Sequence, residues 1–377
     1  MARKKVERNI SYDTTRKLYY VCMNYGSDTG RSNVKQYATF STLPAARKAL
    51  YNFEADKETC QLVMPRSTTL DQWLDYWMRE IVVPSRAETT VYTYQKIIDN
   101  HVSPALGDMP IQKIRPVHIQ QYYSMLQRDK ELSPNTIRRH HDLLSSALHM
   151  AVKQEVLFLS PVERVEPPKT VNTEAHYYTP EHLRELFATV EGHWLELIVK
   201  LAGYLGLRRE EICGLRWSSV NFEQRTIYIK EARTSAGGAI VEKETKNRSS
   251  TRTLYMSGEL QDLLCREQER QAFNRKRFGK RYLESGFVAV DDRGNPYAPN
   301  AISLAFSRFI KQNSLPKLTL HGLRHSFATV ASAQGVPLFD IGRALGHSTP
   351  ATTGRIYTHL VDQTHASTID RVAEAVR

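Results

Sequence analysis

Residues 160 to 179 divide this chain of 377 residues, and this break constrains the fold more than any other feature of the sequence. The stretch contains Pro161, Pro167 and Pro168, is followed at once by Pro180, and shows no hydrophobic periodicity. Proline removes a backbone donor and fixes φ, so a continuous helix cannot run through this stretch. A chain of this length also exceeds one ordinary core. We therefore predict two or three domains, with a hinge that would let two lobes close around a rod-like ligand.

Before the break, hydrophobic residues recur at the spacing of amphipathic helices. The first stripe consists of Leu70, Trp73, Leu74, Trp77 and Ile81. Further helices are expected near residues 89–100, after Pro116, and from Pro134, where Ser133 supplies an N-cap and the proline suits the first helical position. This part of the chain is predicted to be all-helical.

The N-terminal segment differs in composition. Residues 1–57 hold eleven Lys and Arg against five Asp and Glu, so half of the chain's net charge of +12 lies in about a seventh of its length. Aromatic and β-branched residues predict strands at 18–23 and 36–40, followed by a short helix at 44–50. A small sheet with a basic face suits insertion into a DNA groove, although a basic extension without function would look similar.

The part after the break is predicted to be mostly helical with one sheet. Alternating residues predict strands at 225–229 and 252–256, with a flexible turn at 235–238 and a hairpin tip at 243–248. A highly charged helix is expected over residues 259–284.

Composition limits the function classes. The net charge of +12 and the pI of about 9.4 favour a polyanionic partner, although a merely basic surface would give the same totals. The four cysteines form no CxxC pair, which argues against a disulfide framework or a zinc ribbon. No apolar run is long enough to span a bilayer, and the charged start is unlike a signal peptide. We expect a cytoplasmic protein with no membrane partner.

Six polar side chains, one of them a phenol, together supply the groups needed to attack a phosphodiester without a metal. The phosphate gathers negative charge in the transition state, and guanidinium groups can bind it bidentately. A phenol, with a pKa of about 10, needs help to lose its proton, and the departing oxygen needs a proton donor such as lysine. The six are Arg208, Lys246, His321, Arg324, His347 and Tyr357.

The segments around these residues resemble the catalytic domain of the tyrosine recombinases, also called the phage integrase family. Five segments match in order and spacing, which is far more specific than any one of them alone. They are Gly206-Leu207-Arg208 with Glu211 and Leu215-Arg216-Trp217; Lys246 with Arg252-Thr253-Leu254; His321-Gly322-Leu323-Arg324-His325; Leu345-Gly346-His347-Ser348; and Tyr357-Thr358-His359.

The resemblance implies a role for each of the six residues. Arg208 and Arg324 would clamp the scissile phosphate, and His347 would hydrogen-bond it. Glu211 would support the fold around Arg208 rather than take part in the chemistry.

The remaining three would perform the covalent step. Tyr357 would attack the phosphorus, leaving a 3′-phosphotyrosine, while Lys246 would protonate the departing 5′ oxygen. His321 would assist proton transfer at the tyrosine. Because the phosphotyrosine conserves the energy of the cleaved bond, no ATP, metal or other cofactor is expected.

The resemblance extends to the whole chain and implies a mainly α multidomain fold. It implies an N-terminal β-sheet domain that binds arm DNA (1–60), a helical, SAM-like core-binding domain (67–160), a linker (161–178), and a mostly helical α+β catalytic domain with a C-terminal tail (179–377). Such an integrase of a phage or conjugative transposon would act through a Holliday junction as a homotetramer on core and arm sites of double-stranded DNA. An excisionase and a host DNA-bending protein would assist, in the bacterial cytoplasm at the nucleoid.

Several alternatives remain open at this stage. The same chemistry without synapsis would give a DNA-relaxing enzyme like type IB topoisomerases, and a catalytically silent protein could merely occupy recombination sites. His321 and His325 could mimic a metal pair, although no acidic ligand lies between them. The apolar face of the tail at 367–377 suits packing either on its own domain or on a neighbouring subunit.

Overall fold

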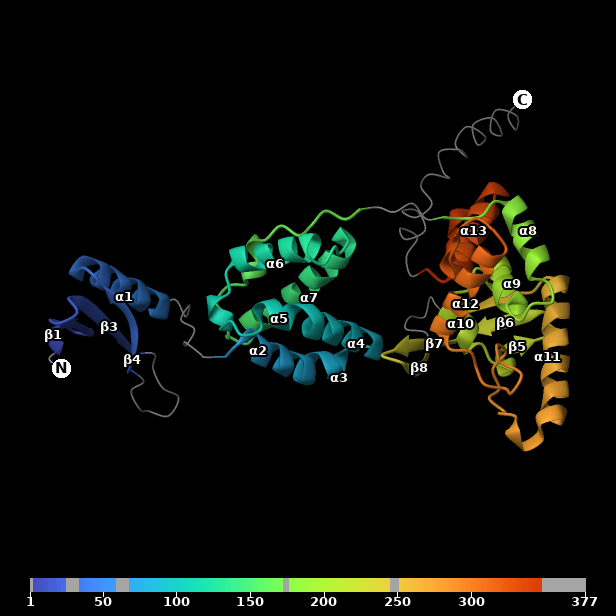
Figure 1. The fold of residues 1–377 in the computed structure, drawn as a ribbon, viewed down its shortest axis with the longest axis horizontal. Helices are drawn as coiled ribbons and strands as arrows, with labels where there is room; N and C mark the ends of the chain where they lie inside the picture. Colours follow the sequence, from blue (N-terminus) through green and yellow to red (C-terminus); the bar gives the residue numbers. More distant parts are fainter. Residues whose placement is uncertain (1–2, 25–33, 59–67, 172–175, 245–250, 348–377) are drawn as a thin grey trace, which may run out of the picture. The chain divides into compact units, whose positions relative to one another are not determined.

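The computed structural model describes residues 3–24, 34–58, 68–171, 176–244 and 251–347. The chain separates into two compact units, Met1–Asn172 and Thr173–Arg377, and each is considered by itself (Figure 1). The boundary between them falls within the predicted break.

The first unit begins with a four-stranded antiparallel sheet in the order β1-β2-β3-β4 and one helix. The elements are β1 (Arg3–Glu7), β2 (Ile10–Asp13), β3 (Leu18–Asn24), β4 (Val34–Phe40) and α1 (Leu43–Glu58). Val21 and Met23 of β3 pack with Ala46 of α1, whereas Tyr20 lies on the opposite face with the guanidinium carbon of Arg3 3.8 Å from its ring centre. The sequence predicts β3 and β4, but β1 is too basic to show alternation, and α1 is longer than predicted.

Helices alone make up the described part of the first unit from residue 68 onward (Figure 1). They are α2 (Leu70–Trp77), η1 (Met78–Val82), α3 (Val83–Ser85), α4 (Glu88–Ile97), η2 (Ile98–Val102), α5 (Ser103–Leu106), η3 (Ile111–Lys113), α6 (Pro116–Arg128), α7 (Pro134–Lys153) and η4 (Pro161–Arg164). Thr69 caps α2 and Ser133 caps α7, each by accepting a backbone N–H. The predicted helices are confirmed.

Two of these helices pass through a π turn shortly before a proline. The π turns η1 and η2 precede Pro84 and Pro104, and the chain returns to α geometry at the residue before each proline, Val83 and Ser103. Proline cannot donate to the carbonyl four residues earlier, and its ring crowds that carbonyl, so a locally wider turn relieves both problems. The hydrophobic stripe therefore continues through each π turn, with Met78 and Val82 buried in the first.

The start of the predicted linker belongs to the helical core. Pro161 and Val162 in η4 and Val165 after it are buried, and both valines join the core of the helical domain. At the other end, Tyr178 is 2% exposed and belongs to the core of the second unit. Packing at both ends thus shortens the stretch that can act as a linker.

The second unit is built around α9, which lies among α8, α11 and α13 (Figure 1). Its helices are α8 (Pro180–Val190), α9 (Glu196–Leu205), α10 (Arg209–Gly214), η5 (Trp217–Ser219), α11 (Gly258–Phe278), η6 (Gly279–Arg281), α12 (Pro299–Gln312), α13 (Leu320–Ala333) and α14 (Leu338–Leu345). Nearly every residue of α9 is buried, including Glu196 and Lys200, which pair at 2.9 Å. The predicted charged helix ends at Phe278, because Gly279 takes a positive φ.

The described strands of this unit form two sheets, whereas the sequence predicts one. Strands β5 (Val220–Asn221), β6 (Thr226–Ile229) and β9 (Arg252–Tyr255) form one antiparallel sheet, while β7 (Glu231–Ala236) and β8 (Ala239–Glu244) form a separate hairpin. Gly237 and Gly238, with φ of 62° and 88°, make the turn between β7 and β8. The predicted turn at 235–238 is thus the tip of this hairpin. Of the tip predicted at 243–248, Lys243 and Glu244 belong to β8, and residues 245–248 lie outside the described residues.

None of the helices in the described ranges is both long enough and apolar enough to cross a membrane.

Candidate active site

Arg208 stands at the N-cap of α10, the helix start that the sequence predicts. Its backbone N–H donates to Glu211 Oε2 at 2.9 Å, and its side-chain Nη1 donates to Glu211 Oε1 at 2.8 Å. The Arg208 side chain is 32% exposed, whereas that of Glu211 is 3% exposed. The carboxylate thus holds the guanidinium from inside while about a third of the arginine side chain stays exposed to solvent. Glu211 has the supporting contacts expected of it.

Arg324 projects from the first turns of α13 into the interior and is 2% exposed. It donates from Nη1 to Gly206 O at 2.8 Å and from Nη2 to Leu345 O at 2.5 Å. Gly206 ends α9 with φ of 61°, and a Cβ there would lie 2.5 Å from Leu345 Cδ2. A glycine is therefore required for this close approach between α9 and α14.

Three arginines from three different elements meet at the C-terminal end of α14. They bind three successive carbonyls: Arg252 Nε to Ala344 O at 2.6 Å, Arg324 Nη2 to Leu345 O at 2.5 Å, and Arg208 Nη2 to Gly346 O at 3.3 Å. The last carbonyls of a helix have no partner within it and form the negative end of its dipole, so cationic donors are favoured there. His347 follows directly after these carbonyls, and its position is thereby tied to the arginines.

Arg252 opens β9 and binds the same carboxylate as Arg208. Its Nη1 donates to Glu211 Oε1 at 3.0 Å and its Nη2 to Glu211 Oε2 at 2.9 Å, with side-chain exposures of 7% for Arg252 and 3% for Glu211. Burial alone would raise the pKa of Glu211, but the hydrogen bonds and charge of Arg252, and then of Arg208, hold it below its ordinary value.

Arg252 lies in one of the segments that resemble the family, but the resemblance implies no role for it. The alternation of β9 could have indicated a structural role for Arg252. The strand alternates between buried and exposed positions, and Arg252 occupies the buried face together with Leu254. An arginine on the core side of a strand implies a buried acidic or carbonyl partner.

The histidines near these arginines are held in the neutral form. Burial, followed by the positive charges of Arg324 and Arg208, lowers the pKa of His347 to about 4. The pKa of His321 is lowered by partial loss of hydration and by the same two arginines, although the residue as a whole is exposed. At neutral pH each imidazole therefore offers one donor and one acceptor nitrogen.

The structure brings together four of the six predicted residues. Arg208, Arg324 and His347 are joined through the end of α14, and His321 lies one helical turn before Arg324 on α13. Lys246 and Tyr357 lie outside the described residues, so their places remain predictions.

His321 contacts a second histidine on the same helix. Its ring lies edge-on to that of His325, with 4.8 Å between ring centres. Within the described ranges, no three His, Cys, Asp or Glu residues are arranged to hold a metal ion.

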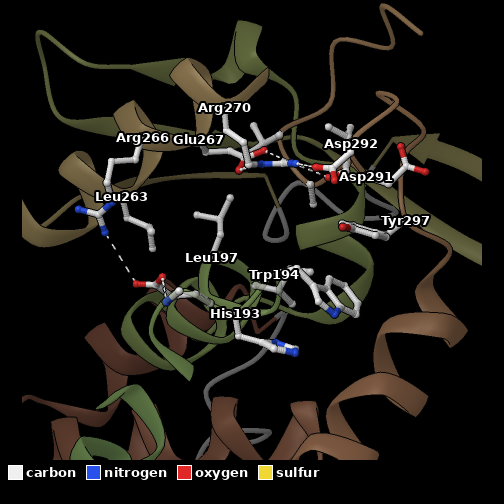
Figure 2. A pocket seen from close by; sticks show the side chains of 16 residues that line it. His193, Trp194, Leu197, Leu263, Arg266, Glu267, Arg270, Asp291, Asp292 and Tyr297 are labelled. Carbon is white, nitrogen blue, oxygen red and sulfur yellow. Dashed lines mark hydrogen bonds and ion pairs between the residues drawn. The ribbon is translucent and has the colours of Figure 1, made fainter. Parts of the chain in front are cut away.

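A separate pocket of about 520 Å³ lies between α11, the start of α9 and the loop at 288–297 (Figure 2). It contains none of the six predicted residues. Trp194 and Tyr297 stand side by side on one wall, 4.7 Å apart between ring centres. On another wall, Arg270 binds Glu267 at 2.8 Å and Asp292 at 2.5 Å. These charges pair with one another within the wall, and none of the six predicted residues lines the pocket, so it does not compete as the catalytic site.

Comparison with known proteins decides the family. The pattern of the phage integrase family matches residues 176–364, just over half of the 377 residues, and that of the phage integrase N-terminal SAM-like domain matches residues 69–127. The chain belongs to the phage integrase family. It is therefore a tyrosine recombinase, a site-specific recombinase of mobile elements that cleaves and rejoins DNA.

Relatives of the recombinase include integrases of several kinds of element. It is 25% identical over 324 residues to a "Tyrosine recombinase XerC-like" protein of Caldanaerobacter subterraneus, covering 81% of this chain and 83% of that protein. It is also 25% identical over 284 residues to the ICEBs1 integrase of Bacillus subtilis, covering 74% and 77%.

Solved structures share the fold of the recombinase. The Tn1549 transposon integrase in complex with a circular intermediate DNA superposes with a TM-score of 0.69 at 21% identity, covering 81% of this chain and 100% of that chain. A lambda integrase tetramer bound to a Holliday junction gives a TM-score of 0.60 at 18% identity, covering 94% and 96%. The predicted mainly α multidomain fold is confirmed.

Proposed function

We propose that the recombinase cleaves double-stranded DNA by forming a 3′-phosphotyrosine at Tyr357, and that Arg208 and Arg324 bind the scissile phosphate. The observation that carries this proposal is the convergence of both guanidinium groups on the end of α14, directly before His347. Two fixed cations and a neutral imidazole at one place provide what a phosphate with growing negative charge requires.

The covalent step balances within the chain's own groups. The phenol oxygen of Tyr357 forms a bond to phosphorus as the bond to the 5′ oxygen breaks. The phenol proton passes toward His321, whose lowered pKa keeps the ring neutral and able to accept hydrogen bonds. Lys246 gives a proton to the departing 5′ oxygen, and His347 hydrogen-bonds the phosphate.

The reverse of this step rejoins DNA. A free 5′ hydroxyl from a partner strand attacks the phosphotyrosine, which replaces one phosphodiester by another through a Holliday junction. One ester bond is exchanged for another at every stage, so the proposal requires neither ATP nor a metal ion.

The N-terminal sheet is proposed to bind arm DNA. The face of the sheet away from α1 holds Arg3, packed on Tyr20, and the strand pairings place Lys5 and Ser11 opposite each other there. A basic and polar sheet face of this kind fits the groove of a duplex. Binding of arm and core DNA by one chain would make the recombinase heterobivalent.

Its assembly follows from the same proposal. Four copies act together on paired DNA sites, and the tail at 367–377, which lies outside the described residues, docks on a neighbouring copy. An excisionase and a host DNA-bending protein assist the reaction. The site of action is the bacterial cytoplasm, at the nucleoid, on DNA of a phage or a conjugative transposon.

Each of the two alternative functions leaves one feature of the chain unexplained. A silent DNA-binding protein would have no use for Arg208 and Arg324 fixed beside His347, and simple relaxation of DNA would have no use for a second DNA-binding domain. Neither accounts for the two features together.

The deciding experiment incubates the recombinase with nicked DNA carrying the ends of its element, in EDTA, and looks for a covalent adduct on a denaturing gel. We expect an adduct with the wild-type protein and none with Tyr357→Phe. Tyr255→Phe is the matched control, because Tyr255 is an exposed phenol, 77% exposed, in the same domain. Absence of the adduct, or an equal adduct with Tyr357→Phe, would overturn the mechanism.

The assignment of the N-terminal domain has its own test. Removing residues 1–57 should abolish binding to arm-site DNA and leave weak cleavage at the core site. Wild-type affinity for the arm site should also fall steeply with salt, because each phosphate contact releases counterions. Equal arm-site affinity in the shortened protein would contradict the assignment.

A further inference from the structure

Two positive side chains share one buried negative side chain beside the proposed phosphate site. Glu211 accepts from Arg208 with Oε1 at 2.8 Å, and from Arg252 with both oxygens at 3.0 and 2.9 Å. Arg252 thus holds the carboxylate through a bidentate contact, whereas Arg208 holds it through one side-chain nitrogen. The three side chains together keep one net positive charge.

This sharing affects the charge that Arg208 presents to a ligand. A carboxylate paired with Arg208 alone would neutralise it, and a neutral ion pair attracts a phosphate far less than a lone guanidinium does. Because Arg252 and Glu211 are 7% and 3% exposed, water screens their interaction little. The side chain of Arg208, at 32%, is the most exposed of the three.

We infer that Arg252 is a positioning residue for DNA cleavage, which offsets the charge of Glu211 so that Arg208 remains effectively cationic toward the scissile phosphate. Arg252 does not itself touch the phosphate in this account. It acts through Glu211, and its Nε bond to Ala344 O at 2.6 Å fixes it to the same helix end that Arg208 and Arg324 bind. This inference rests on the proposed function of Arg208.

The same domain offers a matched control pair with similar geometry. Arg270 donates to both oxygens of Glu267 at 2.8 Å and to Val290 O at 2.8 Å, which repeats the pattern of a bidentate carboxylate and one carbonyl. This pair lines the pocket of Figure 2, which contains none of the six predicted residues. Arg270 also pairs with Asp292, and its side chain is 36% exposed compared with 7% for Arg252. Loss of Arg270 therefore removes a more exposed bidentate ion pair without changing the charge near Arg208.

The experiment measures single-turnover adduct formation on nicked DNA by full-length variants. We expect Arg252→Gln to slow cleavage by about 10- to 100-fold, because Glu211 then neutralises Arg208. Adding Glu211→Gln to that variant should restore the rate by about tenfold, since the single remaining cation is again unopposed. Arg270→Gln should stay within about threefold of wild type.

A neutral substrate separates the charge effect from simple misfolding. With a methylphosphonate at the scissile position, the substrate lacks the negative charge that Arg208 meets, so the defect of Arg252→Gln should shrink to within about threefold. Arg252→Lys, which keeps the charge but not the planar fork, should fall between wild type and Arg252→Gln on the ordinary phosphate. This conservative variant keeps the test usable if Arg252→Gln unfolds, as thermal unfolding monitored by circular dichroism will tell.

Two outcomes would overturn the inference. One is a double variant that is no faster than Arg252→Gln, and the other is a defect of equal size on phosphate and methylphosphonate. Both outcomes would mean that Arg252 only holds the fold. Failure of the proposed function looks different, because the wild-type protein itself would then form no adduct that depends on Tyr357.

Discussion

Two buried polar networks, one in each unit of the chain, differ in charge: one consists of neutral groups and the other of ionised groups. In the helical domain, Tyr122 OH and His140 Nδ1 lie 2.7 Å apart, and the His101 ring lies 5.1 Å from that of His140 between centres. In the catalytic domain, Glu211 binds two arginines. Burial lowers the pKa of His140 to about 4 and raises that of Tyr122, so both stay neutral, whereas Glu211 stays ionised despite its burial.

The difference teaches what each network is suited to do. Neutral hydrogen-bonded groups are inexpensive to bury and fix the packing of α6 against α7. A buried ion pair costs desolvation and adds little stability on average, so its retention needs another reason. In the catalytic domain that reason is the partly exposed guanidinium of Arg208, which the buried charges hold in place.

The contrast is tested most strongly by Arg324→Lys. Lysine keeps the positive charge but cannot bridge Gly206 O and Leu345 O with two nitrogens in one plane. We expect adduct formation on nicked DNA to fall by about 10²- to 10³-fold, the range for loss of one preorganised donor. Unfolding of the helical domain should be unchanged, because the two carbonyls that Arg324 binds, those of Gly206 and Leu345, both belong to the catalytic domain. A rate of adduct formation by Arg324→Lys within threefold of wild type would mean that the geometry of the ionised network does not matter for cleavage.

Local signals in the sequence account for most of the helical domain. The cap at Ser133, the proline at 134 and the apolar stripe predict α7 because each depends only on neighbouring residues. The π turns before Pro84 and Pro104 depend on relief of a clash, which a search for the period of an ordinary α-helix does not detect.

Local sequence signals predict less of the catalytic site. Only the family resemblance gives Arg208 and Arg324 a common role, since 116 positions separate them and no periodicity connects them. The carbonyls that unite them lie at the end of α14, and this meeting depends on tertiary packing. The role of Arg252 depends on packing between distant segments for the same reason, while Lys246 and Tyr357 remain predictions.

Acid should weaken the neutral network in a defined pH window. The pKa of His140 is about 4 in the folded protein, compared with an ordinary value of 6.5, so the unfolded chain binds more protons between these two values. Stability therefore falls as the pH drops from 6.5 to 4, by on the order of 3 kcal/mol for this residue. Denaturant unfolding followed by Trp73 and Trp77 fluorescence would measure it in a protein whose other tryptophans, Trp194 and Trp217, are replaced by Phe.

The control for this window replaces both partners. Tyr122→Phe with His140→Leu removes the titrating ring and leaves no hydroxyl without its acceptor. Its unfolding free energy should depend less on pH between 6.5 and 4 than that of the wild type. An unchanged slope would show that other groups cause the loss.

The smallest expected effect comes from a single hydroxyl. Tyr122→Phe leaves the buried His140 nitrogen without its hydrogen-bond partner and should cost about 1–3 kcal/mol of unfolding free energy. Tyr123→Phe is the matched change, since Tyr123 OH lies 3.0 Å from His141 Nδ1, but His141 is only half-buried, so water can replace the lost bond and the cost should stay below about 1 kcal/mol. Neither variant should alter the rate of adduct formation on nicked DNA at saturating protein.

Two results would contradict this prediction. Equal losses of stability would mean that burial does not distinguish the two bonds, and a slower chemical step in Tyr122→Phe would mean that the neutral network serves catalysis after all.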